Sequence, residues 1–323
     1  MARQTQMKSP ASLPLRALQV DWLQQAEAPA ERVSLPKGQL LKWIGSKHRF
    51  AHAISQRFPS DIRHYWEPFV GSASVLAALA PPRATASDVL QPLVQFWQTV
   101  QSDPGLVEQW YSERWREVLG DPDAAVRAPQ EAKVEGYLQV RRRYNASPNP
   151  ADLLFLLRAS YGGVVRFNSS GGMNTPCGIH RPIAPREFAH RLQQWRPRVL
   201  GTTFENSDFE TMIDRATAGD LVYCDPPYSD SESTLYGAQG FQLARLLAAI
   251  SRAKVRGVRT ALSIDGSKRS GTHQIALDLP DGLFETVAEI DVGRSMLRRF
   301  QLAGQTLESE VVADRLLLTW PEQ

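Results

Sequence analysis

Short apolar runs alternate with helical patterns on both sides of a long central stretch, and this alternation constrains the fold more than any other feature. The expected strands are residues 64–67, 83–87, 202–205, 221–224 and 260–264, with further strand-like runs near 284–290 and 316–320. The expected helices around them are residues 47–58, 72–79, 208–216 and 241–254. This order predicts an α/β fold with a doubly wound, mostly parallel sheet.

The central stretch, from about residue 91 to residue 198, has a mainly helical pattern. Apolar spacing predicts helices over residues 94–98, 106–118, 132–143 and 152–159. The run YGGVVRFNSSGGMNTPCG follows at residues 161–178, and its VVRF is typical of a hairpin arm or an ordered loop. We therefore expect three parts: an extension of residues 1–36 with a short helix around 18–25, an α/β domain of residues 37–91 and 199–323, and an inserted, mainly helical domain of residues 92–198.

Composition narrows the class of protein. A length of 323 residues with 42% apolar and 22% charged residues is ordinary for a globular protein with a sizeable core. Two distant cysteines, Cys177 and Cys224, offer no disulfide framework, which fits a reducing compartment. No apolar run approaches the roughly 20 residues of a membrane helix, and MARQTQMKSP lacks the apolar core of a signal peptide. We expect a soluble, cytoplasmic protein.

Charge is distributed unevenly along the chain. Residues 141–198 contain ten arginines, no lysine and two acids, a net charge of +8, whereas the whole chain carries only +3. A basic insertion beside a glycine-rich loop is typical of contact with a nucleic-acid backbone. A solvated, arginine-rich surface would give the same count, so both interpretations stay open at this point.

The segment EPFVGSASV, residues 67–75, places one glycine between an expected strand and an expected helix. Glycine lets the backbone approach a ligand at the carboxyl edge of a sheet. Only Gly71 is present, so the dinucleotide pattern GxGxxG is missing and a nucleoside ligand without a pyrophosphate is favoured. Asp88 ends the next expected strand, where an acid accepts hydrogen bonds from ribose hydroxyls. A plain turn and a capping aspartate are the alternative.

The segment DPPY, Asp225 to Tyr228, ends the apolar run LVYC. Pro226 and Pro227 fix φ and remove two N–H donors, so the corner presents the Asp225 carboxylate and the Pro226 carbonyl as acceptors. Two acceptors beside a tyrosine ring suit a planar group with an exocyclic amine, such as a base taken out of its stack. A strand end followed by a proline turn is the alternative. Cys224 is expected to be a buried strand residue.

With these motifs in order, the chain resembles the Dam-type (alpha-group) S-adenosylmethionine-dependent DNA adenine-N6 methyltransferases over roughly residues 38–323. LKWIGSK (41–47), EPFVGSAS (67–74), Asp88, NSDF (206–209) and DPPY match the family's motifs. The resemblance implies a Rossmann-like methyltransferase fold whose inserted helical domain recognises the target. It also implies the following cofactor contacts: Trp43, Lys47, Glu67, Phe69, Gly71, Asp88, Asp208, Phe209 and Asp225.

The resemblance further implies that Asp225 and the carbonyl of Pro226, followed by Pro227, hold the target N6 while Tyr228 stacks on the flipped adenine. Residues 161–178 are similar to the family's DNA-contacting hairpin, with Arg166 as a guanine reader. The DNA contacts expected are Tyr161, Arg166, Asn168, Arg141, Arg142 and Arg143.

The implied cofactor is S-adenosylmethionine, with S-adenosylhomocysteine as product, and no metal is expected. The implied partner is duplex DNA, with no membrane, in a cytoplasmic, nucleoid-associated protein. We expect a monomer, although the sequence leaves an oligomer open, and it does not decide between a solitary enzyme and one with a restriction partner.

Three positions depart from the family's pattern. Ala73 replaces the second glycine of FxGxG, and Gly162 stands where the hairpin usually has an asparagine, so GATC is not assigned as the target. GRSMLRRF, residues 293–300, matches only loosely and is not assigned residue by residue. His48 and His52 lie in HRFAH and not in HExxH, so we expect a solvated helix face there.

Other functions remain open to test. N4-cytosine methylation is the nearest alternative, because a DPPY corner can hold either exocyclic amine, and RNA is a further possible substrate. A catalytically silent DNA-binding protein on the same fold would lack a working cofactor site. A nicotinamide oxidoreductase is disfavoured by the missing GxGxxG and by DPPY.

Overall fold

A computed structural model describes residues 35–124, 129–164, 166–168, 170–227, 241–264, 279–291 and 313–321. All of them belong to one of two units of the chain, residues 32–323. The short helix expected around residues 18–25, Tyr228 and the segment 293–300 lie outside the described residues.

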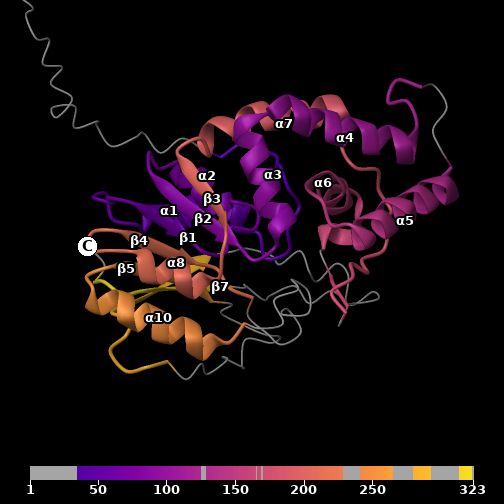
Figure 1. The fold of residues 1–323 in the computed structure, drawn as a ribbon. Helices are drawn as coiled ribbons and strands as arrows, with labels where there is room; N and C mark the ends of the chain where they lie inside the picture. The colour runs from indigo at the N-terminus through magenta and orange to yellow at the C-terminus, as the bar shows by residue number, and fades with distance from the viewer. Residues whose placement is uncertain are drawn as a thin grey trace, which may run out of the picture. The chain divides into compact units, whose positions relative to one another are not determined.

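Seven strands of the described residues form one sheet in the order β3-β2-β1-β4-β5-β7-β6 (Figure 1). Neighbouring strands are parallel from β3 to β5, whereas β7 runs antiparallel to both β5 and β6. This confirms the predicted doubly wound, mostly parallel sheet. The strands are β1 (Tyr65–Glu67), β2 (Ala84–Asp88), β3 (Thr202–Asn206), β4 (Leu221–Cys224), β5 (Arg259–Ile264), β6 (Thr286–Asp291) and β7 (Ala313–Leu318).

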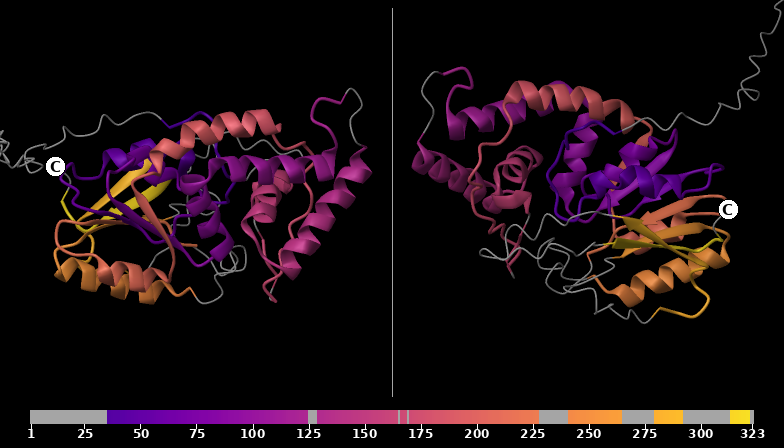
Figure 2. Two further views of the ribbon diagram at one scale, coloured as in Figure 1. Left: turned by 45° about the horizontal axis from the view of Figure 1, so that its top comes forward. Right: turned by 180° about the vertical axis from the view of Figure 1, so that it is seen from behind.

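Helices pack on both faces of the sheet because successive strand residues point to opposite sides. On β4, Leu221 and Tyr223 join one apolar core with α1 (Ala51–Gln56), α2 (Ser74–Leu79) and α3 (Gln91–Ser102). Val222 and Cys224 join a second core with α8 (Phe209–Arg215) and α10 (Leu243–Val255). The helices α8 and α10 lie side by side (Figures 1 and 2). Cys224 is fully buried, as predicted.

The helices α3 to α6 are longer than the sequence patterns predicted, whereas α1, α2, α8 and α10 are shorter. Capping explains two of their starts: Asp103 Oδ1 accepts from the Leu106 N–H, and Asn149 Oδ1 accepts from the Asp152 N–H. The α-helices are α1 (Ala51–Gln56), α2 (Ser74–Leu79), α3 (Gln91–Ser102), α4 (Pro104–Leu119), α5 (Gln130–Ala146), α6 (Pro150–Ala159), α7 (Pro185–Trp195), α8 (Phe209–Arg215) and α10 (Leu243–Val255). The described residues also form the 3₁₀ helices η1 (Lys47–Arg49), η2 (Tyr161–Gly163) and η3 (Arg196–Arg198).

Two features near the start of the α/β part differ from the sequence interpretation. The helix expected over residues 47–58 is split into η1 and α1 at Phe50. The expectation of a solvated helix face is wrong for His48, because its ring packs on Trp195 with centroids 5.9 Å apart and its Nε2 bonds to the Pro36 carbonyl (3.0 Å). His52 is exposed, as expected.

Between β2 and β3, the chain forms α3 to α7. The first of these, α3, packs on β2 and β3, and Gln98 and Gln101 donate to backbone carbonyls of residues 199–204. A buried carboxylate, Asp152, then joins α4, α5 and α6 by accepting from Arg114 and Arg143. The helix α3 spans residue 92, where the domain boundary was predicted, and it packs on the sheet. The boundary remains a prediction.

Candidate active site at the carboxyl edge of the sheet

Parallel strands have their carboxyl ends at one edge of the sheet, and three of the predicted site residues lie at this edge. Glu67 ends β1, Asp88 ends β2, and Asp225 follows β4. Because β1 pairs with both β2 and β4, these carboxyl groups come from neighbouring strands. This is the edge at which doubly wound sheets bind ligands.

The loop between β1 and α2 brings backbone and side chains close together. Gly71 has a φ of +43°, and a Cβ atom added there would lie 2.8 Å from Trp43 Nε1. The Gly71 N–H donates to Asp88 Oδ2 (3.3 Å), and the Gly71 carbonyl accepts from Trp97 Nε1 (3.0 Å). Trp43, Gly71 and Asp88 therefore lie together, and a side chain at position 71 would disrupt the arrangement.

Ala73 adopts the left-handed conformation, with φ 53° and ψ 30°, immediately before α2. This backbone costs an L-residue roughly 1–2 kcal/mol compared with the right-handed one. The alanine is fully buried, and its N–H donates to the Val70 carbonyl at 2.6 Å. The loop thus keeps a turn that glycine adopts readily, although the sequence has alanine at this position.

Asp88 accepts a backbone hydrogen bond on each carboxyl oxygen, from Gly71 on Oδ2 and from Leu90 on Oδ1 (3.0 Å). Burial raises the pKa of Asp88 to about 6, although part of the side chain remains accessible. The backbone donors oppose that shift by stabilising the carboxylate. Above about pH 6, the group can therefore accept further hydrogen bonds from a ligand.

Lys47 forms an ion pair with Asp225 across the site. The Nζ–Oδ1 distance is 2.8 Å, and the exposed fractions are 7% for Lys47 and 18% for Asp225, so the pair is largely shielded from solvent. Lys47 Nζ also donates to the Gly45 carbonyl (3.3 Å). This pairing connects Lys47, predicted to contact the cofactor, with Asp225, predicted to contact both the cofactor and the target base.

Glu67 is buried behind this ion pair. Tyr65 Oη donates to Glu67 Oε2 at 2.6 Å. Burial raises the pKa of Glu67 to about 8, with a further upward contribution from the nearby Asp225 carboxylate. Near neutral pH, Glu67 is therefore mostly protonated and adds little negative charge beside Asp225.

Three serine hydroxyls join the segment 41–47 to the loop after β1. Ser46 Oγ lies 2.9 Å from Ser72 Oγ and 3.2 Å from Ser74 Oγ, and the latter two hydroxyls lie 2.8 Å apart. Gln39 Nε2 donates to Ser46 Oγ (3.2 Å). These bonds fix the position of Lys47 relative to the glycine loop.

An aromatic cluster adjoins the loop. Phe69 stacks on Phe209 with ring centroids 5.3 Å apart, and Phe241 meets both rings edge-on at 5.9 and 5.7 Å. Arg245 lies 5.0 Å above the Phe209 ring and donates to Asp208 Oδ1 (3.1 Å), which also caps α8. The predicted residues Phe69, Asp208 and Phe209 are thus brought together.

The predicted hairpin folds back on itself through antiparallel bridges between Ser160 and Cys177 and between Phe167 and Met173. Asn168 closes its tip, because its Oδ1 accepts from the backbone of residues 170 and 172. Tyr161 and Arg166 are exposed, and Arg166 Nε donates to Asn174 Oδ1 (3.2 Å).

Gly162 has a φ of +65°, and an added Cβ would have Val164 Cγ2 at 3.5 Å as its nearest neighbour. Asparagine tolerates this left-handed region better than most residues, so the position can accommodate either residue type.

The arginines at 141–143 differ in their surroundings. Arg141 donates to the Thr175 carbonyl (2.9 Å), Arg142 is exposed and pairs with Glu135 (2.7 Å), and Arg143 pairs with Glu117 and Asp152. The carboxylate partners raise the pKa of Arg143 and occupy its guanidinium. The positive charge counted in the sequence is therefore partly neutralised inside the helical segment, and the DNA contact of Arg143 stays a prediction.

Sequence reasoning missed several residues that build the site. Tyr65 could have been found because it lies two positions before Glu67 on the same face of β1. Phe241, Arg245 and the serine cluster gave no local signal, since they join segments distant in the sequence. The helix α7, which supplies Trp195 beside His48, was also missed.

The described residues offer neither a membrane-spanning helix nor a metal site. Among the helices that the structure describes, none combines the length and apolar character needed to cross a membrane. In the same part of the chain, no group of three or more His, Cys, Asp or Glu side chains could hold a metal ion.

The doubly wound sheet and the site at its carboxyl edge place the chain in the Rossmann-like class of α/β proteins. Residues 43–274 match the family of D12 class N6 adenine-specific DNA methyltransferases. The chain therefore belongs to this family, which confirms the resemblance found in the sequence. The family implies a DNA substrate and S-adenosylmethionine as the methyl donor.

Individual relatives agree with this assignment. The chain is 28% identical over 239 residues to the DNA adenine methylase of Vibrio cholerae serotype O1, covering 69% of this chain and 79% of that protein. It is 25% identical over 236 residues to the type II methyltransferase M1.LlaDCHI of Lactococcus lactis subsp. cremoris, covering 70% and 80%. It is 27% identical over 242 residues to the DNA N-6-adenine-methyltransferase of Escherichia phage P1, covering 71% and 30%.

Proposed function

We propose that this chain transfers the methyl group of S-adenosylmethionine to N6 of an adenine that is flipped out of duplex DNA. The observation that carries the proposal is the position of Asp225. Its carboxylate follows β4 at the carboxyl edge of the sheet, 2.8 Å from Lys47, and shares this edge with Gly71 and Asp88.

The residues at this edge fit the proposed cofactor. Gly71 has no side chain, so the loop leaves its backbone open to a ligand beside Trp43. Asp88 offers a partly accessible carboxylate to ribose hydroxyls. The stacked rings of Phe69 and Phe209 suit contact with an adenine. When bound, S-adenosylmethionine would supply an electrophilic methyl group.

The role proposed for Asp225 follows from its ion pair. Lys47 holds the carboxylate through Oδ1, so it is already oriented before an amine arrives. Asp225 would accept a hydrogen bond from N6–H and stabilise the positive charge that develops on the nitrogen. The carbonyl of Pro226 would accept the second N6–H, since the two prolines remove competing N–H donors. Stacking by Tyr228 stays a prediction.

A protonated Glu67 supports this division of roles. Because Glu67 is mostly neutral near pH 7, Asp225 is not opposed by a second negative charge directly behind it. Tyr65 Oη donates to Glu67 Oε2 and holds the side chain in place. We therefore assign Glu67 to shaping the cofactor side of the site and not to proton transfer.

DNA recognition is proposed for the hairpin and its neighbours. Tyr161 and Arg166 are exposed on the hairpin, where a guanidinium can pair with two guanine acceptors. Arg141 and Arg142 would contact phosphates, and Asn168 would act by shaping the hairpin tip. The expected setting is a monomer on duplex DNA in the cytoplasm, at the nucleoid, with residues 92–198 as the target-recognition domain.

The test is methylation mapping by single-molecule sequencing in a methylation-deficient host that expresses the chain. N6-methyladenine confined to one short motif is expected. The modification should vanish in Asp225→Asn, a variant that keeps a side-chain oxygen for Lys47. It should persist in the control Asp281→Asn, at an exposed position. Both proteins should still bind S-adenosylhomocysteine in calorimetry. N4-methylcytosine would instead establish the cytosine alternative. A soluble protein without any DNA modification and without cofactor binding would leave only the DNA-binding alternative.

A further inference from the structure

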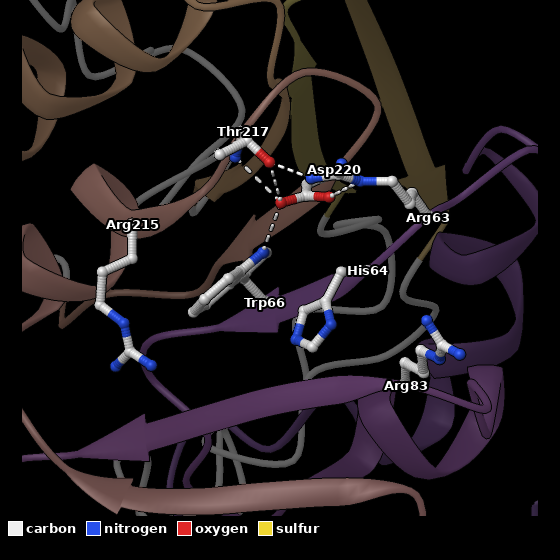
Figure 3. A pocket seen from close by; sticks show the side chains of 7 residues that line it. All are labelled: Arg63, His64, Trp66, Arg83, Arg215, Thr217 and Asp220. Atoms are coloured by element: carbon white, nitrogen blue, oxygen red, sulfur yellow. Dashed lines mark hydrogen bonds and ion pairs between the residues drawn. The ribbon is translucent and has the colours of Figure 1, made fainter.

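A pocket lies at the amino ends of β1, β2 and β4, the sheet edge opposite the candidate active site (Figure 3). Its position follows from the chain: the lining residues precede these strands, begin them or end α8. Its volume is about 280 Å³. The lining residues are Arg63, His64, Trp66, Arg83, Arg215, Thr217 and Asp220.

The single carboxylate of this lining is already saturated. Asp220 is buried, and its oxygens accept from Arg63 Nε (3.0 Å), Trp66 Nε1 (3.1 Å) and both the N–H and the hydroxyl of Thr217 (2.9 and 3.2 Å). Asp220 therefore fixes Arg63 and Trp66 in place, and it does not present an acceptor to the pocket. The remaining lining is rich in donors.

Two further guanidinium groups flank the floor of the pocket. Arg215 pairs with Glu205 and lies 5.3 Å from the Trp66 ring, whose centroid is 4.8 Å from that of His64. Arg83 is exposed at the start of β2, and within the described part of the chain its guanidinium has no hydrogen bond or ion pair. In Figure 3, Arg215 and Arg83 lie on opposite sides of Trp66 and His64.

The carbonyl end of α8 does not counteract this positive charge. Near this end of the helix, Arg256 donates to the carbonyls of Ile213 (2.8 Å) and Ala216 (3.3 Å). His64 is held by Thr85 (2.9 Å), and burial lowers the pKa of His64, with Arg63, Arg83 and Arg215 contributing in the same direction. The Asp220 carboxylate opposes this shift, and an anion in the pocket would likewise raise the pKa of His64.

We propose that this pocket binds a phosphate group through Arg83, with the charges of Arg63 and Arg215 around it. Arg63 and Arg215 already give N–H groups to Asp220 and Glu205, whereas Arg83 can offer all of its N–H donors to a tetrahedral oxyanion. The phosphate could be free or part of a nucleic-acid backbone, and both have the same recognition chemistry. This inference does not depend on methyl transfer, because the pocket lies at the other edge of the sheet.

Calorimetric titration with inorganic phosphate tests the site itself. Arg83→Ala is expected to weaken phosphate binding roughly 10-fold or more, because a lost charged hydrogen bond is worth about a decade in affinity. Arg83→Lys should retain part of the binding, and the control Arg186→Ala, at an exposed arginine on α7, should bind like the unmodified chain. Arg83 holds no described neighbour in place, so its variants should fold, which thermal unfolding would verify.

The salt dependence of duplex DNA binding separates the two sources of phosphate. If a backbone phosphate occupies the pocket, Arg83→Ala should reduce the slope of log K against log salt by about 1. If free phosphate is the ligand, the slope should be unchanged while the calorimetric titration still loses affinity. The proposal is overturned if Arg83→Ala alters neither the phosphate titration nor the slope.

Discussion

Substitution of Glu67 by glutamine tests the electrostatics of the candidate site directly. Glu67 is 3% exposed, and its Oε2 accepts from Tyr65 Oη at 2.6 Å, a bond that a glutamine oxygen can keep. Burial raises the pKa of Glu67 from 4.5 to about 8. The variant therefore removes one ionisation while changing the shape of the site very little.

The sign follows from proton binding. Between pH 4.5 and about 8, the folded state keeps a proton on Glu67 that the unfolded state has released. The free energy of unfolding must then fall as pH rises through this window, by about 1.4 kcal/mol per pH unit. Over the whole window, the loss is at most about 5 kcal/mol, and it is complete above about pH 8. Glu67→Gln lacks this loss.

Urea unfolding of both proteins from about pH 5 to about pH 8 measures the difference. The stability of Glu67→Gln relative to the unmodified chain should grow with pH by up to about 1.4 kcal/mol per unit. Glu131→Gln, at an exposed position in the first turn of α5, should give a constant difference. A constant difference for Glu67→Gln as well would refute the reasoning, because Glu67 would then ionise in the folded protein as it does in the unfolded chain.

Three other substitutions test separate parts of the structure. Because burial raises the pKa of Asp88 to about 6, calorimetric affinity for S-adenosylhomocysteine should fall as pH drops through 6, and Asp88→Asn should abolish that dependence. Gly71→Ala should lower the free energy of unfolding in urea by roughly 1–2 kcal/mol of backbone strain plus the cost of the clash with Trp43. The control Gly171→Ala has a φ of +79° and no neighbour within 4 Å of an added Cβ, so it should show the strain alone. Lys133→Met removes hydrogen bonds to the three consecutive carbonyls of residues 178–180 (2.5, 2.9 and 3.1 Å). It should lower the free energy of unfolding by roughly 1–3 kcal/mol and weaken duplex binding in gel shifts. Unaltered stability would contradict a role of Lys133 in holding the segment after the hairpin.

The strands of the sheet were predictable because each depends on a short apolar run and its flanking turns. The structure contains a strand at every run that the sequence predicted, although the last one covers Ala313–Leu318 and not residues 316–320. Helix ends were less predictable, since capping by Asp103 and Asn149 extends α4 and α6 beyond their apolar patterns. The helix α7 was missed because it follows a loop without a local start signal other than Pro185.

In the candidate site, too, some features could be predicted from the sequence and others could not. The identities of Trp43, Gly71, Asp88 and Asp225 could be taken from motifs, because each motif carries its own turn chemistry. Their partners could not be predicted, because Lys47 lies far from Asp225 in the sequence. The two meet at 2.8 Å because serine hydrogen bonds join the segment 41–47 to the loop after β1, and β1 pairs with β4.

The sequence by itself determined the alternating α/β order, the proline corner after β4 and the family to which the chain belongs, since all three rest on residues close together in the chain. The tertiary structure decided which charges meet. It neutralised part of the arginine excess with Glu117 and Asp152, raised the pKa of Glu67 by burial, and gathered three arginines at the sheet edge away from the candidate active site. The physical reason is that ion pairing and desolvation depend on distances across the fold, which local patterns do not contain.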